Sequence, residues 1–224
     1  MKHLPMERAR IRAAALIACC AAAWQPSIAR AADENTQLWL IGAVRTDLGE
    51  DTHATLDGSL RLREDARGGD EKTIRLTLEQ EVADNVLAGG GAGVWDTETG
   101  ETEVRIFQQL TITRGAFAAR TRLEERIFDG ADRVELRFRQ RMQYTLELSG
   151  SVSASLDGEW LHLVQTRDRL GPQYRDQFRS RAAVTADLGN GLTAGIAYLA
   201  IYDQRGAARD RYAHVPQVSL DWRF

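Results

Sequence analysis

Residues 118–143 read AARTRLEERIFDGADRVELRFRQRMQ, with an arginine or a glutamate at almost every second position. Within each half of the stretch the charged residues share one parity: Arg120, Arg122, Glu124 and Arg126, then Arg133, Glu135, Arg137, Arg139 and Arg141. Apolar residues such as Leu123 and Phe138 stand between them. Because successive side chains of a strand point to opposite faces, this stretch predicts two strands, each with one charged and one apolar face.

The same alternation recurs over much of the chain, and no convincing helical period interrupts it. It is clearest in residues 52–64, 73–81, 103–113 and 178–188. Strands of ten or more residues exceed the five or six that are usual in soluble proteins and match the roughly 9–11 residues that cross a bilayer. A soluble sandwich also alternates, but its strands would be shorter and its polar face would lie outside. The pattern therefore favours an all-β transmembrane barrel.

A barrel gives the charged rows a place. The lipid-facing side of a strand cannot accommodate a charge, whereas the lumen side can when its charges pair or meet water. We therefore predict that the charged rows line the lumen. The lumen-lining candidates are Arg105, Arg120, Arg122, Glu124, Arg126, Arg133, Glu135, Arg137, Arg139, Arg141, Arg179 and Arg181.

The connections alternate in length, as periplasmic turns and extracellular loops do. Short links are expected at 113–116, at 148–150 and at Gly189-Asn190-Gly191, and longer ones at 65–71, 165–173 and 203–210. About eleven segments read as strands, whereas bacterial single-chain barrels have even numbers. We therefore expect a single antiparallel transmembrane β-barrel of 10 or 12 strands. The count becomes even if segment 38–44 is not a strand or if segment 151–164 is broken into two.

The first 31 residues have the pattern of a cleaved signal peptide. Basic residues are followed by an apolar run over 13–23 and by the small-residue site Ala29-Arg30-Ala31. The barrel domain would then be residues 32–224, exported to the outer membrane of a Gram-negative bacterium. The alternative is a lipoprotein signal at residues 16–19, which would acylate Cys19. Simple cleavage is favoured, since the second site would otherwise have no role.

The last strand ends on an aromatic residue. Leu220, Trp222 and Phe224 share one face of the sequence SLDWRF. This pattern is typical of the signal by which barrels are passed to the barrel-assembly machinery, so that machinery and outer-membrane lipid are the expected partners.

Several stretches resemble a family of small, uncharacterised Gram-negative outer-membrane β-barrel proteins, known only as a domain-of-unknown-function family. The resemblance rests on Trp39, RLRE at 61–64, EVRIFQQL at 103–110, RTRLEERIF at 120–128, ELRFRQRM at 135–142, DQFRSRAAV at 176–184 and the final Phe224. Val104 stands where that family would lead us to expect an aromatic residue or a histidine. The resemblance implies a barrel in the outer membrane and carries no catalytic residues.

No arrangement of residues indicates catalysis, a metal site or a cofactor. The histidines outside the leader, His53, His162 and His214, are scattered and none forms a His-x-Ser pair. The glycine-rich AGGGAGVW at 88–95 lacks the lysine of a phosphate-binding loop, and is better explained by a bend or by room for a neighbouring aromatic ring. A net charge of −3 argues against nucleic-acid binding.

The sequence therefore predicts no enzyme, but an envelope component or a narrow passive pore with an Arg/Glu-lined lumen. Eight strands leave a lumen just filled by side chains and about 16–18 leave an open channel, so ten or twelve predict a plugged or narrow one. If the lumen conducts, its arginines would favour a small anionic solute. The alternative is an outer-membrane enzyme that acts on lipid or peptide at the cell surface.

Overall fold

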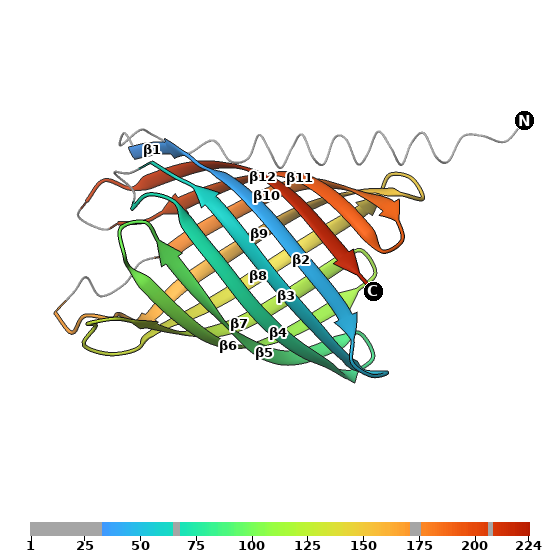
Figure 1. The fold of residues 1–224 in the computed structure, drawn as a ribbon, viewed down its shortest axis with the longest axis horizontal. Helices are drawn as coiled ribbons and strands as arrows, with labels where there is room; N and C mark the ends of the chain where they lie inside the picture. The colour runs from blue at the N-terminus through green and yellow to red at the C-terminus, as the bar shows by residue number, and fades with distance from the viewer. Residues whose placement is uncertain (1–32, 65–67, 171–175, 206–207) are drawn as a thin grey trace, which may run out of the picture. The chain divides into compact units, whose positions relative to one another are not determined.

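In the described part of the chain, twelve strands form one sheet that closes into a barrel (Figure 1). The computed structural model describes residues 33–64, 68–170, 176–205 and 208–224, so the predicted signal peptide and Cys19 lie outside the described residues. The strands are β1 Asp33–Thr36, β2 Leu38–Asp47, β3 Thr52–Leu62, β4 Glu71–Ala83, β5 Val86–Thr97, β6 Thr102–Arg114, β7 Phe117–Phe128, β8 Glu135–Glu147, β9 Val152–Gln165, β10 Asp176–Gly189, β11 Leu192–Asp203 and β12 Arg211–Arg223. The predicted all-β barrel is confirmed. In these ranges no helix is long and apolar enough to cross a membrane.

The ring is closed by a parallel pairing. From β2 to β12 each strand pairs antiparallel with the next, and β12 then pairs parallel with β2, with Gln217 opposite Trp39. The short strand β1 pairs with β12 in the same parallel register, with Asp33 opposite Arg211, so β1 continues β2 across a break at Gln37.

The predicted strand pattern therefore needs one correction. The sheet has twelve strands, but its closed ring runs from β2 to β12 and has an odd number of strands. An odd ring of consecutive antiparallel strands leaves the first and last strands pointing the same way, so the barrel is not purely antiparallel. The two segments to which we attributed the odd strand count, 38–44 and 151–164, do not explain it, because they form the continuous strands β2 and β9.

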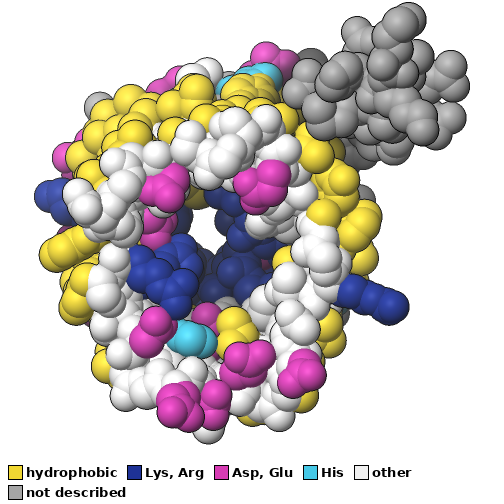
Figure 2. All heavy atoms as spheres, turned by 90° about the vertical axis from the view of Figure 1, so that its right-hand side faces the viewer, with side chains coloured by type: hydrophobic (Ala, Val, Ile, Leu, Met, Phe, Trp, Pro, Cys, Tyr) yellow, Lys and Arg dark blue, Asp and Glu magenta, His cyan; other side chains and the backbone are white. Residues whose placement is uncertain are grey.

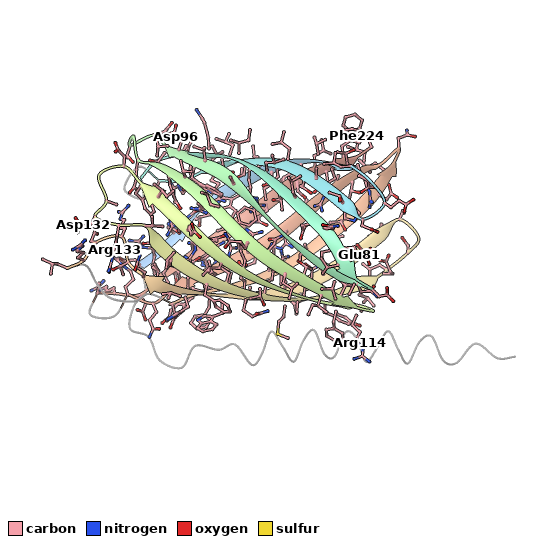
Figure 3. The ribbon with its side chains drawn as sticks, turned by 90° about the horizontal axis from the view of Figure 1, so that it is seen from below. Glu81, Asp96, Arg114, Asp132, Arg133 and Phe224 are labelled. Carbon is pink, nitrogen blue, oxygen red and sulfur yellow. The ribbon has the colours of Figure 1, made fainter. Side chains whose placement is uncertain are left out.

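The connections divide into two rims. The turn rim holds the short links at 48–51, 84–85, 115–116, 148–151 and 190–191, and the loop rim holds the links that follow β3, β5, β7, β9 and β11. The predicted alternation is confirmed, and Gly189-Asn190-Gly191 turns with positive φ at all three residues. In Figure 3, Asp132 and Arg133 mark the loop rim, and Arg114 and Phe224 mark the turn rim.

The two faces of the wall have opposite character. Large apolar side chains are exposed on the outer face, among them Leu56, Ile74, Leu76, Ile106, Leu123, Val184 and Ile196. Charged side chains are buried on the inner face, among them Glu103, Arg105, Arg122, Glu124, Arg139 and Glu159. A water-soluble protein shows the reverse distribution.

The glycine-rich strand β5 makes room for an aromatic ring. A Cβ atom at Gly91 would lie 2.6 Å from Cζ of Phe107, which is buried in the lumen, and would also meet the carbonyl oxygen of Leu76. The expectation that these glycines leave space for a neighbouring aromatic residue is confirmed.

Candidate functional site

The lumen contains a network of arginines and carboxylates centred on Glu124 of β7. Glu124 is only 1% exposed, and its carboxylate accepts hydrogen bonds from Arg137 at 2.5 Å and from Arg139 at 2.7 Å, with Arg122 at 3.5 Å. Arg122 and Glu124 of β7 lie opposite Arg139 and Arg137 of the neighbouring strand β8. Because all four side chains point to the same face of the sheet, they meet in the lumen. A buried carboxylate in such surroundings is held by charge-assisted hydrogen bonds.

Three further carboxylates extend the network along the wall. Glu103 of β6 pairs with Arg105 and with Arg126, which also pairs with Glu135. Glu159 of β9 accepts hydrogen bonds from Arg139 at 2.6 Å and from Arg120 at 2.9 Å. The network therefore links β6, β7, β8 and β9 and offsets most of the charge of this wall.

Aromatic rings support several of these arginines. The guanidinium of Arg105 lies 3.7 Å from the ring centroid of Trp95, and that of Arg122 lies 4.1 Å from the ring of Phe107. A cation over an aromatic face is stabilised by the ring quadrupole, more so when both groups are desolvated.

The opposite wall of this half of the lumen is apolar. Trp39, Leu199, Ile201, Ala213 and Val215 form a buried cluster on β2, β11 and β12. We call this cluster and the Glu103–Glu124 network together the constriction. Glu124 of β7 and Val215 of β12, which belong to the constriction, lie in the half of their strand next to the loop rim. The buried residues Phe107 of β6 and Leu161 of β9 lie in the same half, so packed side chains narrow the lumen there.

The other half of the lumen is a vestibule of 590 Å³ beside the turn rim. Figure 2 shows its mouth, with Lys and Arg side chains deep inside and acidic ones around the rim. Its lining contains more arginines than carboxylates. The arginines are Arg45, Arg75, Arg120, Arg122, Arg141 and Arg181, and the carboxylates are Asp57, Glu79 and Asp221.

The structure places the predicted lumen-lining residues on inward faces with one exception. Arg133 precedes β8, is exposed, and donates a hydrogen bond of 2.8 Å to the carbonyl oxygen of Thr166 at the loop rim. The candidates also omitted Asp157, Glu159, Asp57 and Arg75, all of which pair in the lumen. Their strand parity was the signal that could have identified them.

The residues of the predicted assembly signal lie on the outer face at the end of β12. Leu220, Trp222 and Phe224 are all exposed, and the rings of Trp222 and Phe224 lie 5.1 Å apart. The amide of Phe224 donates to the carbonyl oxygen of Arg45, so the terminal residue is held on the neighbouring strand β2.

The histidines do not converge on one site. His53 contacts Asp47 at 2.6 Å near the turn rim, whereas His162 contacts Asp176 at 2.6 Å near the loop rim. His214 contacts Tyr198 on the outer face. Within the described part of the chain, no three His, Cys, Asp or Glu side chains are grouped as metal ligands would be.

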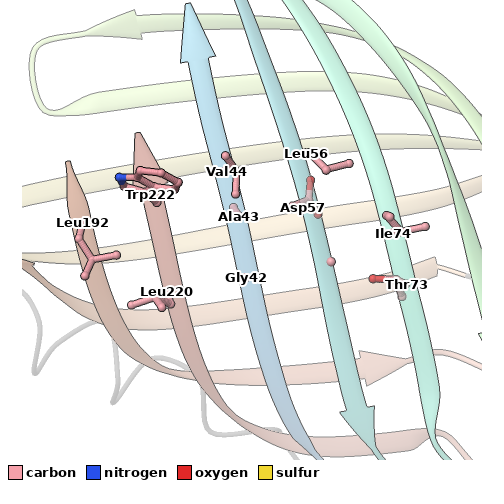
Figure 4. A pocket seen from close by; sticks show the side chains of 11 residues that line it. Gly42, Ala43, Val44, Leu56, Asp57, Thr73, Ile74, Leu192, Leu220 and Trp222 are labelled. Carbon is pink, nitrogen blue, oxygen red and sulfur yellow. The ribbon is translucent and has the colours of Figure 1, made fainter. Parts of the chain in front are cut away.

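The outer face has a groove of 530 Å³ at the parallel closure of the ring (Figure 4). Gly42 of β2 lies opposite Gly58 of β3, and the absence of two side chains leaves the hollow. Its walls are largely apolar and include Leu56, Ile74, Leu220 and Trp222.

Comparison with known proteins identifies a family but no activity. No protein with a curated description matches the chain. A family profile described as "Protein of unknown function (DUF2490)" matches residues 36–213, which span nearly all of the barrel from β1 to the start of β12. The resemblance to a domain-of-unknown-function family is thereby confirmed, and the chain belongs to the DUF2490 family.

Proposed function

We propose that this protein is a non-enzymatic β-barrel of the Gram-negative outer membrane whose constricted lumen forms a narrow, passive, anion-preferring pathway. The observation that carries the proposal is the inverted wall, with exposed apolar side chains outside and ion-paired arginines inside. In water that arrangement would expose a large apolar surface. In a bilayer the apolar outer face contacts lipid and the charged inner face contacts water or other charged side chains.

Strand length supports a membrane location. The strands β2 to β12 contain 10 to 14 residues, enough to cross a bilayer when tilted. Hydrocarbon chains of outer-membrane lipid would fill the apolar groove at Gly42 and Gly58. Export by the leader at 1–31 and recognition of the last strand by the barrel-assembly machinery belong to the same proposal.

The division of the lumen supports a narrow pathway over a wide channel. The constriction packs charged and apolar side chains in the half next to the loop rim, and the vestibule leaves space in the half next to the turn rim. An excess of arginine in the vestibule favours anions. A purely structural barrel is the alternative, and it would differ from the proposed pathway only in that its constriction would not pass ions.

The scattered histidines support the non-enzymatic part of the proposal. A hydrolytic triad needs a nucleophile, a base and an orienting carboxylate that converge. Here the two His–Asp pairs lie near opposite rims, and neither histidine shows a hydrogen bond to a serine or threonine hydroxyl in the described ranges.

Conductance in a planar bilayer tests the pathway, after a heat-shift gel has shown that the protein is folded. We expect small, discrete steps with a reversal potential that favours anions. Large steps without ion preference would contradict the constriction. A folded protein that stays silent would leave a structural barrel and contradict the pathway.

A further inference from the structure

We infer that the vestibule binds one small multivalent oxyanion, a phosphate or a polycarboxylate, at Arg120, Arg141 and Arg181. This inference rests on the proposed function and adds the class and the place of the solute. The three arginines come from β7, β8 and β10 and all line the vestibule.

The three guanidinium groups have too few carboxylate partners to balance their positive charge. Arg141 and Arg181 both contact the same oxygen of Asp157, at 3.0 Å and 2.8 Å. Glu159, which binds Arg120 at 2.9 Å, is also bound by Arg139 at 2.6 Å. Arg120 of β7 also lies directly opposite Arg141 of the neighbouring strand β8, so two like charges face each other.

Unused hydrogen-bond donors point to the same place. The Nε atoms of Arg120 and Arg141 are buried and have no hydrogen-bond partner among the described residues. A buried donor without an acceptor is costly, and an arginine has five donors arranged for bidentate contact with phosphate or carboxylate. An oxyanion between the two side chains would satisfy these donors and separate the like charges.

The size of the vestibule and its other lining residues limit the ligand. A volume of 590 Å³ is in the usual range of small-molecule sites. Asp57 on the facing strands is already paired with Arg75 at 2.9 Å, and Glu79 accepts a hydrogen bond from the neutral Gln109 at 2.7 Å. Even with both carboxylates counted, the lining of the vestibule holds six arginines against three carboxylates, so positive charge remains in excess. Short turns face the periplasm in outer-membrane barrels, so the solute would enter from the periplasm.

Isothermal titration calorimetry on the full chain, expressed in a Gram-negative host and extracted from its outer membrane, tests the inference. The probes are pyrophosphate, citrate and the monovalent acetate. The variants are Arg120→Gln with Arg141→Gln, and Arg114→Gln, which removes an exposed arginine of the turn rim that does not line the vestibule. A heat-shift gel accompanies each sample to show that it is folded.

We expect one multivalent anion per barrel, acetate bound far more weakly, and binding about ten-fold weaker or more in the double variant, because a single charge-assisted hydrogen bond accounts for that factor. Arg114→Gln should bind as the wild type does. Preference for pyrophosphate or for citrate would assign the anion as phosphate or carboxylate.

Absence of binding to a folded outer-membrane barrel, or binding unchanged in the folded double variant, would overturn the inference and leave the proposed function standing. A double variant that does not fold would be replaced by Arg120→Lys with Arg141→Lys, which keeps both charges but removes the bidentate donors and should also bind more weakly. Unweakened binding in that variant would overturn the site. A chain missing from the outer membrane would contradict the proposed function itself.

Discussion

Thr55 and Leu56 are neighbours on β3 whose side chains face opposite sides of the wall. Leu56 is 47% exposed on the outer face, and Thr55 lines the vestibule. Arginine at a mid-bilayer, lipid-facing position costs about 2–4 kcal/mol, whereas the lumen accepts charge. We therefore expect Leu56→Arg to lower the free energy of unfolding in lipid vesicles by that amount, measured by urea titration, and Thr55→Arg to lower it far less.

The two variants share a strand and a substituted residue, so each is the control of the other. Equal losses at the two positions would mean that β3 does not separate lipid from lumen, and the membrane proposal would lose its main support.

Glu124 is paired with three arginines in the constriction. Removing one partner from a buried ionic network leaves the others uncompensated, which costs about 3–5 kcal/mol. Since Glu124 contacts Arg122, Arg137 and Arg139, we expect Glu124→Gln to lower the free energy of unfolding by an amount in that range. Glu101→Gln, which removes an exposed partner of Arg167, should change the free energy of unfolding little. A similar loss in both variants would mean that Glu124 does not stabilise the barrel more than an exposed ion pair does.

At the scale of single strands, the glycines of β5 allow an aromatic ring to enter the lumen. A Cβ atom at Gly91 would collide with Phe107 and with the backbone of β4, so Gly91→Ala should destabilise the barrel by about 1–3 kcal/mol, as overpacking does. Gly42→Ala is the matched control, because a Cβ atom there would meet no atom of the described residues within 4 Å. The midpoint of the heat-shift transition measures both variants. A tolerated Gly91→Ala would show that Phe107 is not packed as described.

What the sequence predicts at this scale is local. Alternation identifies strands and faces because the side-chain period of a strand is two residues, and Gly189-Asn190-Gly191 identifies a turn because these residues adopt positive φ readily. The pairing of β12 with β2 joins residues at opposite ends of the chain, such as Trp39 and Gln217, and no local pattern specifies its direction. The division of the lumen into constriction and vestibule is not predicted by local pattern either, because it depends on which long side chains meet across the lumen.

At the scale of the whole molecule, the odd ring places the two ends of the barrel at opposite rims. The strand β1 begins at the loop rim, beside the start of β12, and β12 ends at the turn rim. A barrel with an even number of strands would have both ends at one rim. If the turn rim faces the periplasm, Glu34 of β1 lies on the same side of the membrane as the loop residue Asp132 and opposite to Arg114.

This topology can be measured by labelling single cysteines on intact cells with a membrane-impermeant maleimide. The described residues contain no cysteine, and the wild-type chain is the blank for Cys19 and Cys20. We expect Glu34→Cys and Asp132→Cys to be labelled on intact cells and Arg114→Cys only after the outer membrane is made permeable. Labelling of Glu34→Cys together with Arg114→Cys would mean that the first strand enters from the turn rim, and the parallel closure with its odd ring would be wrong. Labelling of Arg114→Cys alone on intact cells would keep the odd ring and reverse the barrel in the membrane, so that the vestibule would open to the outside of the cell.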